Sequence, residues 1–433
     1  VAALALSTVA FAAGKPQLGD FGYDATGMDK AVAPGDDFYK FANGKWDEAT
    51  PIPADRSSWG GFAVLRNLSD ERTREVIQQA AAAKGAPGSN GQKVGDFYSS
   101  FMDEATIEAK GLAPIKPELQ AIAALKTPAQ LAAWMGDANR SGVTVPIGVQ
   151  VEQDLKDNSK YAVYVGQGGL GLPDRDYYLD DSNPKFVEAR AKYKAHVAAM
   201  LKLAGIADAD ADAKAQRIFD LETKIAKTHW TRAQSRQIEK LYNPVATAEL
   251  AAKMPGLDWA AYLKAAGVNQ PQLIVAQPSA VTGTAALIAS EPLSVWQDYL
   301  TYHALSNAAP VLPKAFVAED FAFKGTTLAG TPQLKERWKR AVDMVNGGMG
   351  EAVGQLYVAK YFPPESKAKA EQLVKNLIAA MDMRLQRLEW MAPETKAQAR
   401  DKLAAFTYKI GYPDKWRDYS KLEIRAGDAF GNA

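Results

Sequence analysis

The feature that most constrains the fold is the spacing of apolar side chains at three- and four-residue steps over long stretches. The clearest stretch is residues 370–388, where the apolar positions are Ala370, Leu373, Val374, Leu377, Ile378, Met381, Leu385 and Leu388. This period is typical of an amphipathic helix, so we expect one stripe of this helix to be buried. Pro393 predicts the start of a second helix, because proline suits the first helical turn. This helix should run through Phe406 to a stop near Gly411.

Similar spacing predicts further helices over residues 57–82, 127–139, 185–203, 213–230, 294–308 and 333–345. Strand patterns are few. Residues 147–151 and 161–165 alternate around a polar centre and predict a β-hairpin, and residues 273–276 predict a third short strand. No internal repeat of about 20–50 residues indicates a solenoid. The chain is therefore expected to be mainly α, with a small β-hairpin and one large helical domain.

The charge balance argues against two classes of partner. The chain has 433 residues, with 51 Lys and Arg against 50 Asp and Glu, and its net charge is +1. Such a chain has no strong field to attract nucleic acid or an anionic membrane surface, so we expect neither as a partner. It has no Cys, which excludes disulfides, thiolate zinc sites and a cysteine nucleophile.

The histidines do not form a recognisable zinc motif. The three are His196, His229 and His303, and a zinc-peptidase helix needs two His four residues apart with a Glu beside the first. Each lies in a predicted helical segment, where packing or a hydrogen bond explains it. We assign no catalytic or metal-binding residue in this chain.

Two other motifs also have structural explanations. The glycines of residues 166–171 match the dinucleotide pattern G-x-G-x-x-G, but a loop sequence, residues 172–176, follows where that site requires a helix. The acidic residues of 208–212 resemble a calcium loop, but Ala213 stands where the loop needs Gly, so an acidic helix start is expected.

Two sets of polar and aromatic residues are expected to brace the fold. Asp174, Arg175 and Asp176 should form a cluster of ion pairs in a loop. The tryptophans are expected to pack helices together, although a carbohydrate platform is the alternative: Trp46, Trp59, Trp296, Trp338 and Trp390.

The N-terminus reads as the remnant of a signal peptide. Residues 1–13 are apolar and Ala-rich, and Ala10-Phe11-Ala12 has the small-x-small form that precedes signal cleavage. This run is shorter than the ~20 apolar residues that span a bilayer, so no membrane span is expected in the mature chain. We expect a bacterial protein that is periplasmic or secreted.

Several short motifs occur in a distinctive order. They are Pro34-Gly-Asp-Asp-Phe-Tyr-Lys-Phe-Ala-Asn-Gly-Lys-Trp46, Ser58-Trp-Gly-Gly-Phe62, Gly169-Leu-Gly-Leu-Pro-Asp-Arg-Asp-Tyr-Tyr-Leu179, Arg337-Trp338, Leu356-Tyr-Val358, Trp390-Met391 and Ile410-Gly-Tyr-Pro413. In this order the chain resembles the N-terminal region of the neprilysin/endothelin-converting-enzyme family of zinc metallopeptidases, in its bacterial oligopeptidase branch. The resemblance covers nearly everything from Pro34 to the C-terminus.

The resemblance implies a large helical N-terminal lobe that covers the substrate chamber of a two-lobed peptidase for short peptides. The thermolysin-like catalytic lobe, with its HExxH motif and zinc, is mostly absent, so the chain alone is expected to be inactive. The partners implied are peptide substrates and that missing C-terminal lobe. The implied divisions are a signal-peptide remnant (1–13), an extended segment (14–35), the helical N-terminal domain (36–410) and the start of the connection to the catalytic domain (411–433).

The resemblance also implies two substrate-binding positions. Family members that trim peptides hold the substrate's C-terminal carboxylate with Arg residues of this lobe, and the motif over residues 97–111 places Ser99 and Lys110 there. Lys110 keeps the charge without the bidentate fork of Arg, and Ser99 loses the charge. Endopeptidase action is therefore favoured over dipeptide release. The alternative for Lys110 is a solvated side chain before the helix-ending Gly111.

Two other classes of function remain open at this point. The chain is alternatively a stand-alone peptide-binding module built on the same lobe, or a structural helical envelope protein without catalysis.

Overall fold

A computed structural model describes residues 24–433, so the interpretation of residues 1–13 as a signal-peptide remnant lies outside the described residues. The chain divides into two compact units, Val1–Leu65 and Arg66–Ala433. In the first unit, a short 3₁₀ turn (η1, Ala25–Gly27) precedes α1 (Phe38–Ala49). Helix α1 begins where the Asp37 side chain accepts a hydrogen bond from the Lys40 amide, a common N-terminal cap.

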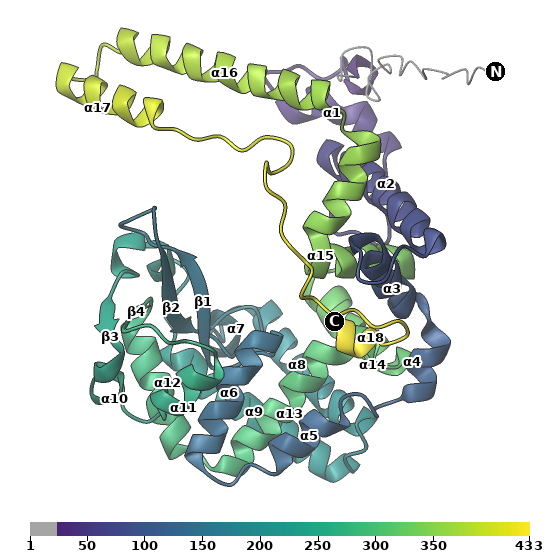
Figure 1. The fold of residues 1–433 in the computed structure, drawn as a ribbon, viewed down its shortest axis with the longest axis vertical. Coiled ribbons are helices and arrows are strands. Elements are labelled where there is room, and N and C mark those ends of the chain that lie inside the picture. The colour runs from purple at the N-terminus through teal and green to yellow at the C-terminus, as the bar shows by residue number, and fades with distance from the viewer. Residues whose placement is uncertain (1–23) are drawn as a thin grey trace. The chain divides into compact units, whose positions relative to one another are not determined.

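The second unit is mainly helical, as expected (Figure 1). Helix α2 (Gly61–Ala83) begins just before the unit boundary. The α-helices that follow it are α3 (Asn90–Met102), α4 (Glu104–Lys110), α5 (Lys116–Ala123), α6 (Pro128–Ser141), α7 (Asp176–Leu179), α8 (Pro184–Leu203), α9 (Asp208–Thr228), α10 (Leu250–Lys253), α11 (Trp259–Ala265), α12 (Pro278–Ser290), α13 (Leu293–Ala308), α14 (Lys314–Asp320), α15 (Arg337–Tyr361), α16 (Pro364–Arg387), α17 (Pro393–Ala404) and α18 (Ala429–Asn432). Short turns lie between them: η2 (Gln234–Arg236), η3 (Ile238–Lys240), η4 (Thr247–Glu249), η5 (Ala309–Val311) and the π-type η6 (Phe321–Leu328).

Local sequence explains where several helices begin and end. Thr127 caps α6 through a hydrogen bond from the Gln130 amide, and Gly142 ends it with a positive φ of 75°. Helix α9 begins at Asp208, which confirms the predicted acidic start. The predicted end of the last long helix is wrong, because α17 stops at Ala404. The sequence beyond it, residues 406–410, is rich in aromatic and β-branched residues, which are weak helix formers.

A four-stranded sheet lies beside these helices. Its strands are β1 (Ile147–Gln153), β2 (Tyr161–Gln167), β3 (Pro244–Ala246) and β4 (Gln272–Val275), in the order β1-β2-β4-β3. Strands β1 and β2 form the predicted antiparallel hairpin, and β4 confirms the predicted third strand. Strand β4 runs parallel to β2, and the sequence prediction missed β3, which has three residues and begins with proline.

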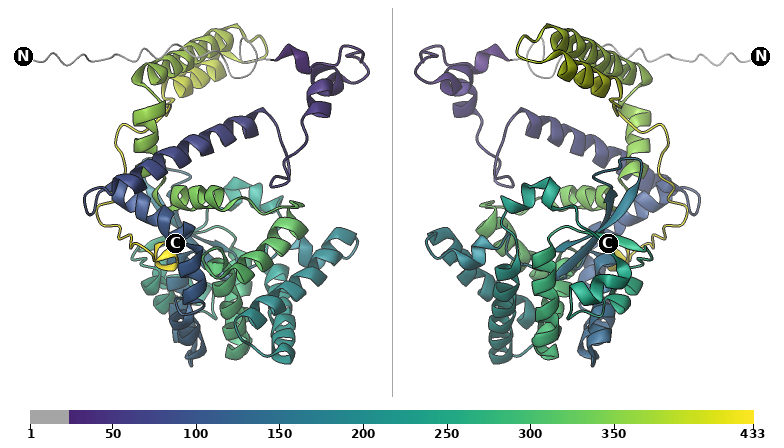
Figure 2. Two further views of the ribbon diagram at one scale, coloured as in Figure 1. Left: turned by 90° about the vertical axis from the view of Figure 1, so that its right-hand side faces the viewer. Right: turned by 90° about the vertical axis from the view of Figure 1, so that its left-hand side faces the viewer.

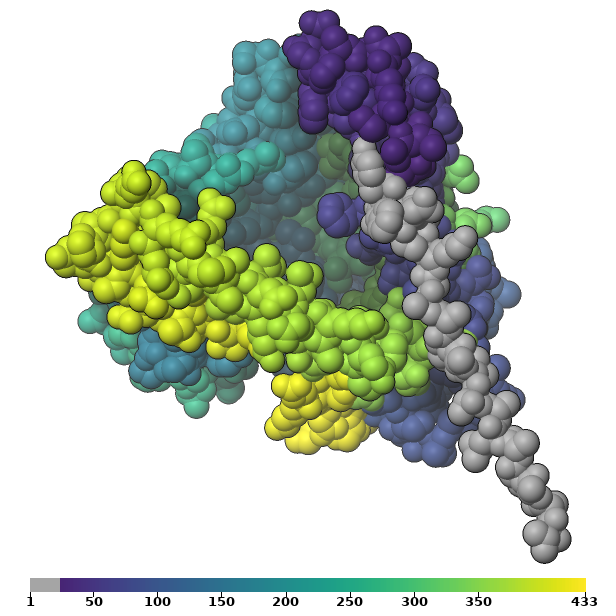
Figure 3. Space-filling view, turned by 90° about the horizontal axis from the view of Figure 1, so that it is seen from above, coloured from purple at the N-terminus to yellow at the C-terminus, as the bar shows by residue number. Residues whose placement is uncertain are grey.

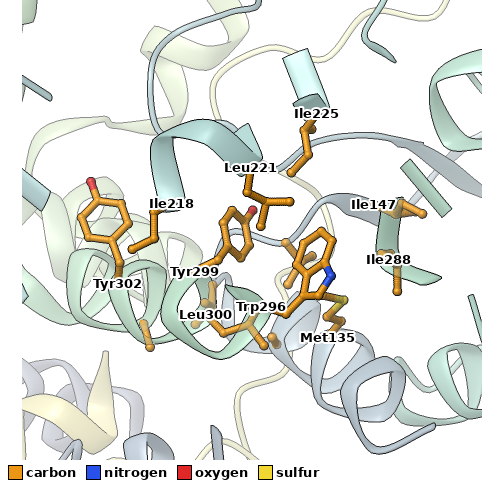
Figure 4. Packing of buried hydrophobic residues seen from close by; sticks show 14 of the residues in the cluster. Met135, Ile147, Ile218, Leu221, Ile225, Ile288, Trp296, Tyr299, Leu300 and Tyr302 are labelled. Carbon is orange, nitrogen blue, oxygen red and sulfur yellow. The ribbon is translucent and has the colours of Figure 1, made fainter. Parts of the chain in front are cut away.

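Two hydrophobic cores stabilise the second unit. The larger one joins the sheet to α5, α6, α8, α9, α11, α12 and α13, and Trp296, Leu221 and Ile147 lie within it (Figure 4). The smaller one joins α2, α3, α4 and α15, and it includes Tyr419 and Ala429 from the last part of the chain. Figure 2 shows these helices from two further directions.

A buried carboxylate lies inside the larger core. Glu222 of α9 has no exposed surface. It accepts hydrogen bonds from the Tyr178 hydroxyl at 2.6 Å, the Tyr193 hydroxyl at 2.9 Å and His303 Nε2 at 2.8 Å. Burial, and then the charge of Glu222, raises the pKa of both tyrosines well above 10, so they remain donors. This one side chain therefore connects α7, α8, α9 and α13.

The expectation of a buried stripe on α16 is wrong. No residue of α16 is buried, and Leu373, Leu377 and Met381 are 60%, 61% and 50% exposed. We call these three residues the α16 stripe. Helix α16 packs against α17, where Arg400 Nε lies 2.6 Å from Asp382, and the described residues supply no cover for the other side. Figure 3 shows the two helices, in yellow-green and yellow, at the surface.

The tryptophans divide between core and surface. Trp296 is fully buried and packs edge-on against Tyr299, as expected, and Trp338 packs at the border of the smaller core. Trp390 is 77% exposed, so its expected packing role is wrong. It lies three residues beyond Arg387, the last residue of α16.

We predict that Glu222→Gln lowers the free energy of unfolding by about 3 kcal/mol. The Gln amide nitrogen can only donate, but the Tyr178 and Tyr193 hydroxyls and His303 Nε2 all donate to this position. At least one of these buried donors would therefore lose its acceptor. Urea unfolding followed by circular dichroism measures the change. The exposed Asp220→Asn of the same helix is the control and should stay within about 0.5 kcal/mol. Equal effects of the two substitutions would contradict the role of Glu222.

Candidate functional site

The two predicted substrate-binding residues lie on successive helices. Ser99 is exposed on α3, and Lys110 is the last residue of α4. Lys110 Nζ donates to the Gly427 carbonyl at 2.7 Å, so its ammonium is engaged with the main chain of the last segment. Within the described part of the chain, no hydrogen bond joins Ser99 to Lys110. Their role in reading a substrate carboxylate stays a prediction.

Each histidine has a partner of its own. His303 pairs with Glu222, His196 Nδ1 lies 3.0 Å from Glu319, and His229 Nε2 lies 3.0 Å from the Gly168 carbonyl. Because a carbonyl only accepts, His229 Nε2 carries the proton. Hydrogen bonds and packing thus explain all three. Over residues 24–433, no group of three or more His, Asp or Glu is placed to hold a metal ion, so these residues do not fit a zinc site.

The glycine-rich loop after β2 is explained by close packing. Gly169 has a φ of +89°, and a Cβ there would lie 2.5 Å from Pro146 Cα. A Cβ on Gly171 would lie 1.9 Å from the Tyr193 hydroxyl. The Tyr299 hydroxyl donates to the Gly169 carbonyl at 2.9 Å. These glycines let the loop pass over the tyrosines that surround Glu222, so no nucleotide is needed to account for them.

The polar residues that follow the loop brace it, as expected. Asp174 forms an ion pair with Arg232 and accepts a hydrogen bond from the Asp176 amide at 2.7 Å. Arg175 Nε donates to the Ala226 carbonyl of α9 at 3.3 Å. Tyr178 then reaches Glu222 and also accepts from the Leu172 amide at 2.9 Å. The motif over residues 169–179 is therefore anchored on the buried carboxylate.

Two cavities flank α15. One of about 560 Å³ lies by residues 408–414, where Lys367 Nζ donates to the Tyr412 carbonyl at 3.1 Å and pairs with Asp414 at 3.0 Å. The other, of about 520 Å³, is lined by Phe97, Phe101 and Arg340 among others. Burial, and then Arg337, lowers the pKa of Arg340. Neither cavity has a Ser, Thr, Cys or His among its lining residues.

Comparison with known proteins gives a consistent result. The family model described as peptidase family M13 matches residues 34–413. Endothelin-converting enzyme 1 of Rattus norvegicus is 27% identical over 412 residues, covering 92% of this chain and 53% of the relative. Neprilysin-3 of Drosophila melanogaster is 27% identical over 438 residues, covering 94% of this chain and 55% of the relative. The chain thus spans about half the length of these curated relatives.

Solved structures share the fold. The zinc metalloprotease Zmp1 of Mycobacterium tuberculosis, in complex with an inhibitor, matches with a TM-score of 0.90 and 39% identity over 95% of this chain and 62% of that chain. PepO of Lactobacillus rhamnosis matches with a TM-score of 0.81 over 93% of this chain and 64% of that chain, at 21% identity. At that identity the second match shows only that the fold is shared.

We predict that Gly171→Ala lowers the free energy of unfolding by about 1–3 kcal/mol, the usual cost of overpacking. The added methyl group would meet the Tyr193 hydroxyl, which is held by Glu222. Thermal unfolding measures the loss. Gly148→Ala is the matched control, because a Cβ there meets nothing within 4 Å. A Gly171→Ala protein as stable as this control would contradict the packing argument.

We predict a pH dependence of stability from His229. Burial lowers its pKa from 6.5 to about 4 in the folded chain. Between these values the unfolded state binds the extra proton, so stability falls as the pH falls, by on the order of 3 kcal/mol in total. Unfolding free energies at pH 7 and pH 4.5 measure this loss. In His229→Gln, which cannot titrate, the loss should be smaller, and equal losses would refute the assignment.

Proposed function

Because the chain belongs to peptidase family M13, we propose that it is the covering N-terminal lobe of an exported, zinc-dependent metalloendopeptidase that hydrolyses short peptides. The match to the family over residues 34–413 carries this proposal. The relatives and the Zmp1 structure confirm the resemblance to the neprilysin/endothelin-converting-enzyme family. Peptidases of this family are zinc enzymes.

In this proposal, zinc and its ligands belong to the portion of the relatives that the chain does not match. A bound zinc ion would polarise the scissile carbonyl and lower the pKa of its water. The described residues do not fit that role, so we assign them none of these steps. Their proposed part is a rigid shell that keeps folded proteins and bulk water out of the chamber. The buried Glu222 network, which connects four helices, supports such rigidity.

The α16 stripe supports the existence of a covering partner. An apolar row on a helix surface is unfavourable in water and marks a site of interaction. We propose that the catalytic lobe covers Leu373, Leu377 and Met381. Trp390, which follows the end of α16 and is also exposed, is proposed as a further residue that the catalytic lobe covers.

The placement of Lys110 supports endopeptidase action. Its ammonium is held by the Gly427 carbonyl, and Ser99 carries no charge. A substrate's C-terminal carboxylate would therefore find no Arg fork at these two positions. Internal peptide bonds are the proposed targets.

Export is also part of the proposal. It rests on the leader-like residues 1–13 and on the absence of Cys, which suits an oxidising compartment. Among the helices of residues 24–433, none is long and apolar enough to span a bilayer.

The central test joins genetics to enzymology. We expect the reading frame beyond the codon for Ala433 to encode an HExxH helix, and the full product to cleave a quenched fluorescent peptide in a chelator-sensitive way. The chain alone, supplied with zinc, should not cleave it. An immediate stop codon in an intact native gene would contradict the proposal and favour a stand-alone peptide-binding module. Chelator-sensitive cleavage by the chain alone would contradict the division of roles.

We predict that the α16 stripe drives self-association of the isolated chain. Replacing Leu373, Leu377 and Met381 together by Ser should raise the monomer fraction, because apolar area contributes about 25 cal/mol per Å² buried. Sedimentation velocity measures the change. Replacing Gln372, Asn376 and Ala380 by Ser on the adjacent exposed row is the control, without change of charge. Equal association of the wild type and both variants would refute the prediction.

A further inference from the structure

Strand β1 lies at the edge of the sheet (Figure 1). Two hydrogen bonds show which of its residues are bonded to β2. The Gly168 amide donates to the Pro146 carbonyl at 3.1 Å, and the Asp154 amide donates to the Lys160 carbonyl at 3.0 Å. Both bonds involve even-numbered residues on the β1 side. In an antiparallel pair, every second residue of a strand exchanges hydrogen bonds with the partner strand. The main-chain groups of the odd-numbered residues 147–153 therefore face away from β2.

The first half of this edge is covered. The Ile147 carbonyl accepts from the Tyr262 hydroxyl at 2.5 Å, and the Val149 amide donates to Asn139 Oδ1 at 3.1 Å. The second half is open. Over the described residues, the Val149 carbonyl, both main-chain groups of Val151 and the Gln153 amide have no hydrogen-bond partner. They form a row of two acceptors and two donors at the spacing of a strand.

The open half also lacks the usual protection of an edge strand. Natural edges are blunted by proline, lysine or a bulge, and the sequence here is Val149-Gln-Val-Glu-Gln153. Its one charge, Glu152, lies on the even face. Val151 is 60% exposed on the odd face.

A groove runs beside the open half on its odd face. The groove has a volume of about 260 Å³, and its apolar lining is Val149, Val151, Val163, Ala266 and Val268. Arg140 is the one charged residue among the groove's lining residues. The groove thus suits an apolar side chain next to an acidic one.

We propose that the open half of β1 binds an extended peptide as an added antiparallel strand, with a β-branched apolar residue opposite Val151 and an acidic residue opposite Val149. The peptide would complete four main-chain hydrogen bonds, and its carboxylate would face Arg140 across the groove. The choice of a peptide as ligand rests on the proposed function. The groove is apart from Lys110 and Ser99, which do not line it.

The test uses fluorescence anisotropy with fluorescein-labelled Gly-Thr-Thr-Thr-Val-Thr-Glu-Thr-Gly. Val151→Pro removes one outward amide, which an edge strand tolerates, and Val151→Thr keeps that amide as the control. N-methylation of the peptide's Val amide removes the donor to the Val151 carbonyl, and N-methylation of the next Thr blocks an amide that faces away. Val151→Pro and methylation of the Val amide each remove one main-chain hydrogen bond, so each should weaken binding about tenfold. Val151→Thr and methylation of the Thr amide should each weaken binding by less than about twofold.

The absence of saturable binding up to about 1 mM peptide would overturn the proposal. So would equal affinities within each pair, that is, between the two Val151 variants and between the two N-methylated peptides. A dimer of the chain that Val151→Pro abolishes would also overturn it, because a second copy would then be the occupant. Thermal unfolding by circular dichroism verifies that each variant is folded, and the N-methylated peptides test the register on the unaltered chain. Binding is measured without zinc or hydrolysis, so a failure here is distinguishable from a failure of the proposed catalytic role.

Discussion

The larger core is organised around a carboxylate that has no access to water. Removing an ionised group from solvent is costly unless hydrogen bonds replace its hydration, and Glu222 obtains them from two tyrosines and one histidine. Each donor comes from a different helix, so the helices must take specific positions for the core to form. The glycine-rich loop depends on the same arrangement, because Gly171 leaves room for the Tyr193 hydroxyl that Glu222 holds. One buried charge therefore constrains both the bundle and the loop above it.

The local pattern predicted several long helices, because capping residues and apolar periods act within a few residues. Thr127 before α6 and the acidic start of α9 at Asp208 are of this kind. The pattern did not predict α1, α3 or α12, and it ended α15 at residue 345, whereas that helix runs to Tyr361. The pattern failed where the outcome depends on distant partners. The period of α16 indicates an apolar face, but it does not say what covers that face, and Leu373 and Leu377 are exposed in this chain. Strand β3 was missed because its pairing with β4 is set by tertiary contact.

The candidate site was predictable only in part. Because no two histidines have the spacing of a helical metal pair, the sequence predicted that packing or a hydrogen bond explains each one. In the structure each of the three has a separate hydrogen-bond partner. Sequence reasoning could not find the contact between Lys110 and the Gly427 carbonyl, which joins residues far apart in the chain. Nor could it find the open half of the β1 edge. That half is open because the Asn139 and Tyr262 side chains bond only to main-chain groups of the first half. Both features arise from packing between elements, which the spacing of apolar residues along the sequence does not predict.

The parallel pairing of β2 with β4 affects how the chain folds. Tyr164 and Ile274 lie opposite each other, and α7, α8, α9, α10 and α11 are all in the loop between them. The hairpin of β1 and β2 closes over a few residues and can form early, whereas the β2–β4 contact must wait until a long loop is closed. During synthesis, β2 leaves the ribosome well before its second neighbour exists. Until β4 arrives, that side of β2 is a second unpaired edge, and an unpaired edge favours misassembly of a nascent chain.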